Sequence, residues 1–359
     1  MTLFDRVADL PLVVEESSRE RHERDTSSGF LRKSTTFLLR GEAATGRGED
    51  VTYDAEDHDA LADAPTDLVS EWGLDGEWTF GEFSGALDEG IEDGEVDLFP
   101  TKPPEREASR HYRRWAVESA ALDLALRQSD RSLGETLERE YAPVRFVAST
   151  RLGDPPTTDR VEAIRERVPD IEFKLDPTPD WTDDLVADLA ETGAVRVLDL
   201  KGRYEGTEVD NPADPDLYRR VFEGFPDAVV EDPGVSDEVA ALVEEHGGRV
   251  SWDYPITGVE SVEELPFEPN WLNVKPSRFG TVESLFETVE WADERGVSLY
   301  GGGQFELAVG RDQIQALASL LYPDGPNDVA PGVYNDPDVP AELPASPLPA
   351  PAGEPGFGN

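Results

Sequence analysis

The chain has 359 residues, of which 78 are Asp or Glu and 32 are Lys or Arg, so its formal net charge is −46. So acidic a chain cannot present a large basic surface, which argues against binding to a nucleic-acid backbone or to an anionic membrane surface. It contains no cysteine, which excludes disulfides, thiolate metal sites and a cysteine nucleophile. We expect a cytoplasmic protein, because the N-terminus lacks a signal-peptide pattern and no apolar run is long enough to span a bilayer.

Lysine is scarce among the basic residues. There are 27 Arg but only five Lys, namely Lys33, Lys102, Lys174, Lys201 and Lys275. An acidic chain with few lysines is typical of a cytoplasmic protein from a salt-loving organism of the haloarchaeal type, because salt screens the repulsion between dense carboxylates. Lysine is disfavoured on such a surface, so each remaining lysine is a candidate for a specific role.

The first part of the chain predicts a mixed α and β domain. Residues 32–40 are rich in β-forming side chains and lead to a glycine-containing turn at 46–49. An acidic stretch with helix-like pieces follows, and residues 107–128 carry apolar side chains at helical spacing. A further short helix is expected at 132–140.

From about residue 143, short β-branched runs alternate with amphipathic segments, a pattern that predicts strands alternating with helices. Strands are expected at 145–149, 172–176, 196–200, 228–232, 250–254, 271–275 and 298–301. Helices are expected at 158–168, 182–192, 215–224, 236–246, 259–265, 281–295 and 311–321. A βα unit repeats about every 22 to 32 residues, and so many consecutive units favour a closed (β/α) barrel over an open sheet.

The pattern divides the chain into four parts. We expect an α+β capping domain over residues 1–140 and a (β/α) barrel over 141–320. Residues 321–335 should pack back on the cap or the barrel. The last part, 336–359, holds seven Pro and little periodicity, which predicts a disordered tail.

Three acidic residues stand at the ends of successive predicted strands: Asp199, Glu231 and Asp253. In a (β/α) barrel, side chains at the carboxyl ends of the strands face the site. Three carboxylates at one barrel mouth repel each other unless a cation lies between them. Oxygen ligands without cysteine favour Mg²⁺, with Mn²⁺ as the alternative.

Three of the five lysines, Lys174, Lys201 and Lys275, also fall at strand ends. A lysine in a dry pocket or beside another cation can act as a base. The same lysines could instead form ion pairs with the nearby acids. Asp176 lies two residues after Lys174 and should point to the same side of the strand.

The order of these motifs resembles the enolase superfamily, in particular its muconate-lactonising and mandelate-racemase-like branch. The stretch RKSTTFLLRGEAATGRGE is similar to the opening β-meander of that family's cap, and RWAVESAALDLALRQSDRSLGETL to the helix leading into its barrel. VVEDP, NVKPSRFGTV and GGGQFELAVG are similar to its strand motifs. The resemblance spans about residues 30–320 and implies an α/β fold, a modified (β/α) barrel with an N-terminal α+β capping domain.

By this resemblance Asp199, Glu231 and Asp253 would be Mg²⁺ ligands, and Lys275 would be an acid/base on one face of the substrate. The enzyme would remove the proton alpha to the carboxylate of a small substrate, with the metal stabilising the enediolate. The reaction would be that of a cycloisomerase, a racemase or epimerase, or a lyase such as an o-succinylbenzoate-synthase-like enzyme. Relatives commonly assemble, so a homo-oligomer is an open alternative.

Two strands depart from the family pattern. The second strand usually carries Lys-x-Lys, but here it is Lys174-x-Asp176. On the third strand Lys201 takes the place of the usual Asn in Asp-x-Asn. Lys201, Lys174 or Asp176 could serve as the second acid/base, or Lys201 and Asp176 could pair and silence each other. Two further functions therefore stay open: a non-catalytic or repurposed homologue, and a sugar-acid dehydratase.

The glycine run that ends the last predicted strand has two interpretations. Gly302 and Gly303 could cradle a substrate anion with backbone N–H groups, or they could form a tight barrel turn. Glu306, which follows, could close the site or pair with Lys275. Arg151 and Arg278 could grip a second anionic group of the substrate.

Overall fold

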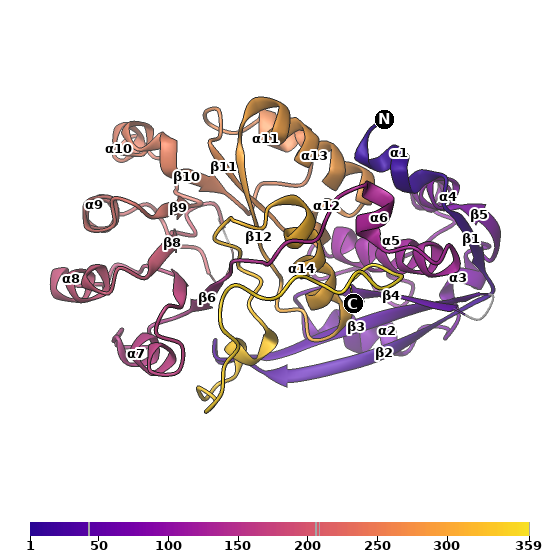
Figure 1. The fold of residues 1–359 in the computed structure, drawn as a ribbon, viewed down its shortest axis with the longest axis horizontal. Coiled ribbons are helices and arrows are strands. Elements are labelled where there is room, and N and C mark those ends of the chain that lie inside the picture. Colours follow the sequence, from indigo (N-terminus) through magenta and orange to yellow (C-terminus); the bar gives the residue numbers. More distant parts are fainter. Residues whose placement is uncertain (42–43, 205–206, 208, 359) are drawn as a thin grey trace.

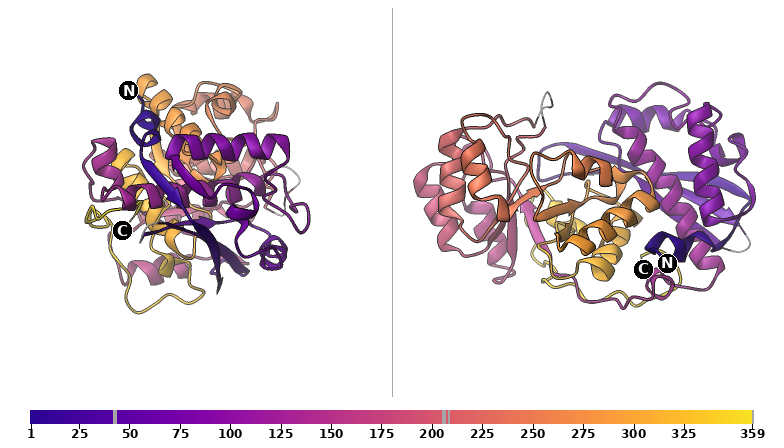
Figure 2. Two further views of the ribbon diagram at one scale, coloured as in Figure 1. Left: turned by 90° about the vertical axis from the view of Figure 1, so that its right-hand side faces the viewer. Right: turned by 90° about the horizontal axis from the view of Figure 1, so that it is seen from above.

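A computed structural model describes residues 1–41, 44–204, 207 and 209–358, which form an N-terminal cap and a C-terminal barrel (Figure 1). The two parts lie side by side when the molecule is seen from above (Figure 2). This architecture confirms the predicted fold class, a modified (β/α) barrel with an N-terminal α+β capping domain.

In its described residues the cap contains two antiparallel sheets and six helices. Its larger sheet has the order β2-β3-β4, formed by β2 (Glu16–Asp25), β3 (Leu31–Gly41) and β4 (Ala44–Asp50). Its smaller sheet pairs β1 (Pro11–Val14) with β5 (Gly76–Thr79). The helices are α1 (Leu3–Ala8), α2 (Ala55–Ala62), α3 (Leu68–Glu71), α4 (Phe80–Asp93), α5 (Ser109–Gln128) and α6 (Leu133–Leu137). The helix-like acidic stretch thus becomes α2 to α4, whereas α1 was not expected.

The glycines of β4 allow this strand to lie directly on α5, the long buried helix of the cap. A Cβ atom added at Gly46 would lie 2.1 Å from the carbonyl oxygen of Ala120, and one added at Gly48 would lie 2.1 Å from that of Ala116. Any larger residue would push the strand off the helix. The turn expected at 46–49 is therefore wrong: these residues lie inside strand β4, where the glycines are needed for packing.

The barrel is a curled parallel sheet of seven strands with the order β12-β11-β10-β9-β8-β7-β6. Its strands are β6 (Val147–Thr150), β7 (Glu172–Leu175), β8 (Val195–Asp199), β9 (Val229–Glu231), β10 (Val250–Trp252), β11 (Trp271–Val274) and β12 (Ser298–Gly301). The remaining helices are α7 (Asp159–Arg165), α8 (Asp183–Glu191), α9 (Pro215–Gly224), α10 (Ala240–Glu245), η1 (Gly247–Arg249), α11 (Val259–Glu263), α12 (Pro276–Phe279), α13 (Val282–Arg295), α14 (Val309–Leu321) and η2 (Gly332–Asn335). Within the described ranges, no helix is both long enough and apolar enough to cross a membrane.

Residues 327 and 328 bridge the gap between the first and last strands of the barrel. The N–H of Val147 donates to the carbonyl of Asn327 at 2.9 Å, and the N–H of Asp328 donates to that of Gly301 at 2.8 Å. The side chain of Asn327 also accepts from the N–H of Gly301 at 2.6 Å. A segment that follows the last helix therefore occupies the position of an eighth strand.

The proline-rich C-terminal segment is packed, which corrects the expectation of a disordered tail over 336–359. Leu348 exchanges two backbone hydrogen bonds with Val144, of 2.8 and 3.0 Å. Farther on, Phe357 is buried, and its N–H donates to Asp123 of α5 at 2.7 Å. Proline lacks an N–H donor, so the segment forms no regular element, yet its apolar side chains still have a surface to bury against.

Two buried side chains of the cap hold it on the barrel. Glu49, in β4, accepts from the N–H groups of Leu307, Ala308 and Gly310 at 2.7 to 3.0 Å. These N–H groups lie around the start of α14. The first N–H groups of a helix have no acceptor within the helix, so Glu49 supplies one. On the other side of the same loop, Arg32 donates to the carbonyl of Gln304 at 2.9 Å. The loop after β12 is thus fixed by the cap.

Candidate active site

The carboxyl ends of the barrel strands open on a cavity of about 200 Å³ that the cap covers. Ser28, Tyr53 and Tyr112 reach it from the cap. The barrel lines it with charged side chains, among them Lys174, Asp176, Asp199, Lys201, Lys275, Arg278 and Asp328. Most of the candidates predicted from strand ends therefore meet at one place.

The three acidic candidates form a buried row. Asp199 and Glu231 are register partners on β8 and β9, and Glu231 is in turn opposite Ser251 on β10. Asp253 follows just beyond the end of β10. None of the three carboxylates is more than 1 % exposed. Burying so many acids in a row requires cations beside them.

Each of these acids faces a lysine. Lys174 Nζ lies 2.5 Å from Glu231 Oε1 and 3.5 Å from Asp199 Oδ2. Lys201 Nζ lies 2.6 Å from Asp199 Oδ2, and Lys275 Nζ lies 2.8 Å from Asp253 Oδ2. The scarce lysines of the strand ends thus converge on the acidic row.

These contacts fix the charge of Lys174, on β7, and of Lys201, just after β8. Burial would lower the pKa of Lys174, but Glu231 and Asp199 hold it well above its ordinary value. The pKa of Lys201 is likewise raised, against the effect of burial, by Asp176 and Asp199. Both side chains are therefore held as ammonium groups at neutral pH.

The pKa values of Asp199 and Glu231 are shifted in opposite directions. Burial would raise the pKa of Asp199, but Lys201 and Lys174 hold it below its usual range. Burial raises the pKa of Glu231 to about 8, against the opposing effect of Lys174 and with the help of the neighbouring carboxylates. Asp199 is therefore ionised at neutral pH, whereas Glu231 is largely protonated there.

Glu231 is held in place by two side chains that the sequence reasoning missed. The hydroxyl of Tyr300 donates to Glu231 Oε2, and the amide of Asn273 donates to the same oxygen at 3.0 Å. Asn273 precedes Lys275 by two residues and so shares its strand face, which is a readable signal. Tyr300, on β12, had no such signal.

Asp232 is a further site residue that the strand-end argument overlooked. It is fully buried, and its two oxygens accept from the N–H groups of Asp253 and Tyr254 at 2.9 and 2.8 Å. Burial raises its pKa to about 7, with the charge of Asp253 adding to the effect. Its only sequence signal is that it follows Glu231.

The acidic residues fit a divalent cation. Asp199, Glu231 and Asp232 each offer a carboxylate oxygen, and these oxygens lie within 4.8 Å of one another. Asp253, the third ligand expected from the sequence, has one buried oxygen, Oδ1, without a hydrogen-bond partner. Such hard oxygen donors suit Mg²⁺ or Mn²⁺.

Asp253 is surrounded by donors that face the cavity. Besides Lys275, the hydroxyl of Tyr204 donates to its Oδ2 at 3.1 Å. Arg278 Nη1 lies 3.0 Å from Oδ1 without the alignment of a hydrogen bond. Burial would raise the pKa of Asp253, but Arg278 and Lys275 hold it below the usual value.

The backbone is strained at this site. Lys201, Asp232 and Phe305 have left-handed conformations, with φ of 52°, 47° and 57°. Residues with a side chain rarely adopt this region, and such strain gathers at functional sites. The same strand ends that supply the acids and lysines therefore also carry the unfavourable backbone.

The altered second strand produces a contact with the third. Asp176 Oδ2 lies 3.5 Å from Lys201 Nζ and 3.4 Å from Arg151 Nε. The sequence has Asp176 where the Lys-x-Lys pattern would put a second lysine. Lys201, at the end of the neighbouring strand, extends to this aspartate. Both side chains line the cavity.

The loop after β12 corrects one expectation. Glu306 does not pair with Lys275: its Oε1 accepts from the N–H of Gln304 at 2.7 Å, and its Oε2 lies 3.2 Å from Arg311 Nη2. The left-handed turn at Phe305 carries Glu306 away from the strand ends toward α14.

The glycines of the same loop are needed for packing. A Cβ added at Gly302 would lie 2.8 Å from Lys275 Cε, and one at Gly303 would lie 2.5 Å from Glu306 Oε2. The N–H of Gly302 already donates to the carbonyl of Val274 at 2.9 Å. This favours the tight-turn interpretation for Gly302.

Two family models match the chain, and together they span nearly all of it. The N-terminal domain of the domain of unknown function DUF8230 matches residues 5–136, and the C-terminal domain of DUF8230 matches residues 140–336. The chain belongs to this family. No curated protein matches the DUF8230 chain significantly.

Solved structures match the DUF8230 chain over most of its length. A muconate cycloisomerase from Pseudomonas fluorescens is 17 % identical with a TM-score of 0.65, covering 97 % of this chain and 96 % of that one. The muconate lactonizing enzyme from Pseudomonas putida is 18 % identical with a TM-score of 0.64, covering 88 % of each chain. A dipeptide epimerase from Methylococcus capsulatus, complexed with a Mg ion, is 17 % identical with a TM-score of 0.63, covering 86 % of this chain and 88 % of that one. At such identities the likeness shows a shared fold, that of the enolase superfamily.

Proposed function

We propose that the DUF8230 chain is a metal-dependent enzyme that removes the proton alpha to the carboxylate of a small substrate. The observation that carries this proposal is the buried acidic row of Asp199, Glu231 and Asp253, which lies beneath a covered cavity with Lys201 and Lys275 beside it. The fold shared with muconate cycloisomerases and a dipeptide epimerase supports the same reaction class.

Asp199, Glu231 and either Asp232 or Asp253 would hold the cation, which we propose to be Mg²⁺. When bound, it would supply Lewis-acid stabilisation of the negative charge that develops on the substrate carboxylate. Tyr300 and Asn273 keep Glu231 oriented for this role, because both donate to its Oε2. The cap keeps water out by covering the strand ends.

Lys275 would remove the proton, and Lys201, an ammonium group, would return one. Lys201 follows β8 and Lys275 follows β11, so strands β9 and β10, with Glu231 and Asp253 at their ends, lie between them. A substrate held over the acidic row would then have one amine on each side. Lys174, held as an ammonium group in the row itself, would bind the substrate carboxylate rather than move a proton.

Isotope exchange tests this proposal. Incubation in heavy water with Mg²⁺, high salt and a broad set of small carboxylic acids should give exchange of an alpha proton, detected by NMR. Lys275→Ala should lose the exchange, and Lys102→Gln, a change at a partly exposed lysine paired with Glu105, should keep it. Absence of exchange across the set would count against the proposal. Analysis of the products would separate racemisation from dehydration, since dehydration gives a 2-keto acid.

A second candidate, a binding protein that kept the barrel, is favoured by one specific observation. Each expected metal ligand already has a lysine within 2.8 Å. This candidate requires weak or absent Mg²⁺ binding. Calorimetry in high salt decides the matter, because tight stoichiometric binding that is lost in Glu231→Gln would rule the second candidate out.

A further inference from the structure

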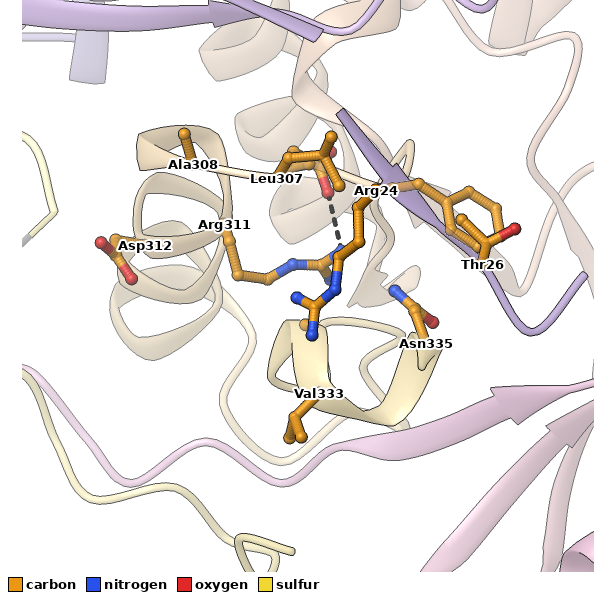
Figure 3. A pocket seen from close by; sticks show the side chains of 11 residues that line it. Arg24, Thr26, Leu307, Ala308, Arg311, Asp312, Val333 and Asn335 are labelled. Carbon is orange, nitrogen blue, oxygen red and sulfur yellow. Dashed lines mark ion pairs between the residues drawn. The ribbon is translucent and has the colours of Figure 1, made fainter. Parts of the chain in front are cut away.

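A second cavity lies at the seam between the cap and the barrel, outside the acidic row (Figure 3). Its volume is about 270 Å³. The end of β2 supplies one wall, the loop between β12 and α14 supplies another, and η2 supplies the third. Four charged side chains line it: Arg24 of the cap, Arg311 and Asp312 of α14, and Glu306 of the loop before α14.

The guanidinium groups of Arg24 and Arg311 point toward one another across this cavity (Figure 3). Two like charges that face each other repel, more strongly where water is partly excluded. The arrangement is unusual in a chain of net charge −46, in which carboxylates are abundant. Asp312, which also lines the cavity, points away from the two arginines (Figure 3).

Both arginines have a carboxylate partner, but Arg311 and its partner Glu306 keep hydrogen-bonding atoms unsatisfied. Arg24 pairs with Asp336, and Arg311 Nη2 lies 3.2 Å from Glu306 Oε2. That oxygen and Arg311 Nε are both buried without a hydrogen-bond partner. The Arg311 side chain is only 11 % exposed, so solvent does not readily serve its Nε. A buried donor of this kind is costly unless a ligand completes it.

We propose that this arginine pocket binds a small anion bearing a carboxylate or phosphate group, at a site separate from the proposed active site. The planar forks of two guanidinium groups match the oxygens of either group. Asn335, on the wall formed by η2, adds the neutral donor of its side-chain amide (Figure 3). The volume accommodates a compact organic anion as well as an inorganic one.

An anion at this place would tie the cap to the barrel. Arg24 belongs to β2 of the cap and Arg311 to α14 of the barrel. Nearby, the N–H of Ser27, just after β2, donates to the carbonyl of Asn335 in η2 at 2.7 Å. Phe305 lines both this pocket and the cavity over the acidic row. Its ring packs edge-on against Phe30 of the cap loop, 5.4 Å away. Occupancy of the arginine pocket would therefore stabilise the closed arrangement of cap and barrel next to the active site.

Thermal unfolding of the full chain tests the site directly. Inorganic phosphate, sulfate and succinate are titrated separately while ionic strength is held constant with potassium chloride. We expect a saturable rise of Tm with phosphate or with succinate. A response to phosphate would show that the site prefers a phosphate group, and a response to succinate that it prefers a carboxylate. Calorimetric titration of the same anion should give one site per chain.

Matched arginine variants separate a specific site from a general salt effect. Arg24→Gln and Arg311→Gln should each weaken binding at least tenfold, and Arg311→Lys, which keeps the charge but loses the fork, should fall between them and the parent. Arg219→Gln, a change at an exposed arginine paired with Asp216, should bind like the parent. Arg24 is 43 % exposed, so its variant is expected to fold even if Arg311→Gln does not. No saturable effect of any of the three anions, or equal titrations in the parent and in Arg24→Gln, would overturn the proposal.

Discussion

Two of the buried clusters of opposite charges in this molecule are built differently. The cap cluster consists of Asp50, Arg113 and His58. Arg113 Nε donates to Asp50 Oδ2 at 2.8 Å, and its other nitrogens donate to the carbonyls of Leu98 and Asp57 at 3.0 and 3.2 Å. His58 Nδ1 lies 4.0 Å from Asp50 Oδ2. Asp50 Oδ1 accepts from the N–H and the hydroxyl of Thr52 at 2.9 and 2.6 Å.

The mouth cluster at the strand ends is less complete. It contains Asp199, Glu231, Asp232, Asp253 and the three lysines Lys174, Lys201 and Lys275. Buried atoms without a hydrogen-bond partner remain on Asp253, on Arg278 beside it and on Asn273 beside Glu231. Left-handed backbone occurs at Lys201 and Asp232. A buried charge network that serves only stability satisfies its polar atoms, whereas one that awaits a ligand keeps some of them open.

The largest effect that this comparison predicts is at Arg113. Arg113→Met should lower the free energy of unfolding by about 3–5 kcal/mol, because Asp50 would remain buried without its charge partner. Chemical denaturation in high salt measures this loss. Arg110→Met, on the same helix but at an exposed arginine, should change stability by at most about 1 kcal/mol. Similar small losses in both variants would mean that the cap cluster does not depend on its charges.

Lys174 offers the corresponding change in the mouth cluster. Lys174→Met should make Mg²⁺ bind roughly tenfold more tightly, about 1.4 kcal/mol, because a cation would no longer compete with an ammonium group for Glu231 and Asp199. The rise of Tm on adding Mg²⁺ at constant ionic strength should therefore be larger in the variant than in the parent. Lys33→Gln, a change at a lysine paired with Asp59 in the cap, should respond like the parent. An unchanged response in Lys174→Met would show that the lysine and the cation do not compete.

The pH dependence of stability should report on the cap cluster through His58. Burial lowers the pKa of His58, although Asp50 opposes the effect. The unfolded chain takes up the proton at its ordinary pKa of about 6.5, and the folded chain resists it to a lower pH. The contribution of His58 to the free energy of unfolding should therefore be fully present above about pH 6.5 and should be lost as the pH falls below that value. His58→Gln should flatten this fall in denaturation curves collected between pH 7 and 5, and an unchanged slope would assign the acid sensitivity to other groups.

The strand ends could be predicted from the sequence because they depend on local periodicity. Each of the seven barrel strands starts and ends within about two residues of its expected bounds, so Asp199, Glu231 and Asp253 were found where parallel strands end. Their lysine partners stood out because lysine is rare in this chain. Both signals are contained in short stretches of sequence.

What the sequence did not reveal depends on backbone turns and on contacts between distant segments. Alternation along β9 places Asp232 on the face opposite Glu231, but a left-handed turn at Asp232 brings its carboxylate back to the site. The same kind of turn at Phe305 sends Glu306 to Arg311 rather than to Lys275. Arg24 and Arg311 come together only because the cap packs on the barrel. No local sequence pattern around either residue indicates that the two are neighbours.

The smallest predicted effect isolates the backbone strain that distinguishes the two clusters. Lys201→Gly and Lys201→Ala both remove the amine, so the difference between them reports on the left-handed conformation at φ 52°. The alanine variant must adopt a conformation that costs roughly 1–2 kcal/mol, which outweighs the extra entropy that glycine loses on folding. Lys201→Gly should therefore be more stable than Lys201→Ala, by about 0.5–1 kcal/mol in chemical denaturation. At Arg113, inside α5, the order should reverse, because glycine is the poorer residue in a helix by a similar amount. If the glycine variant were less stable than the alanine variant at both positions, the left-handed backbone at Lys201 would not be strained.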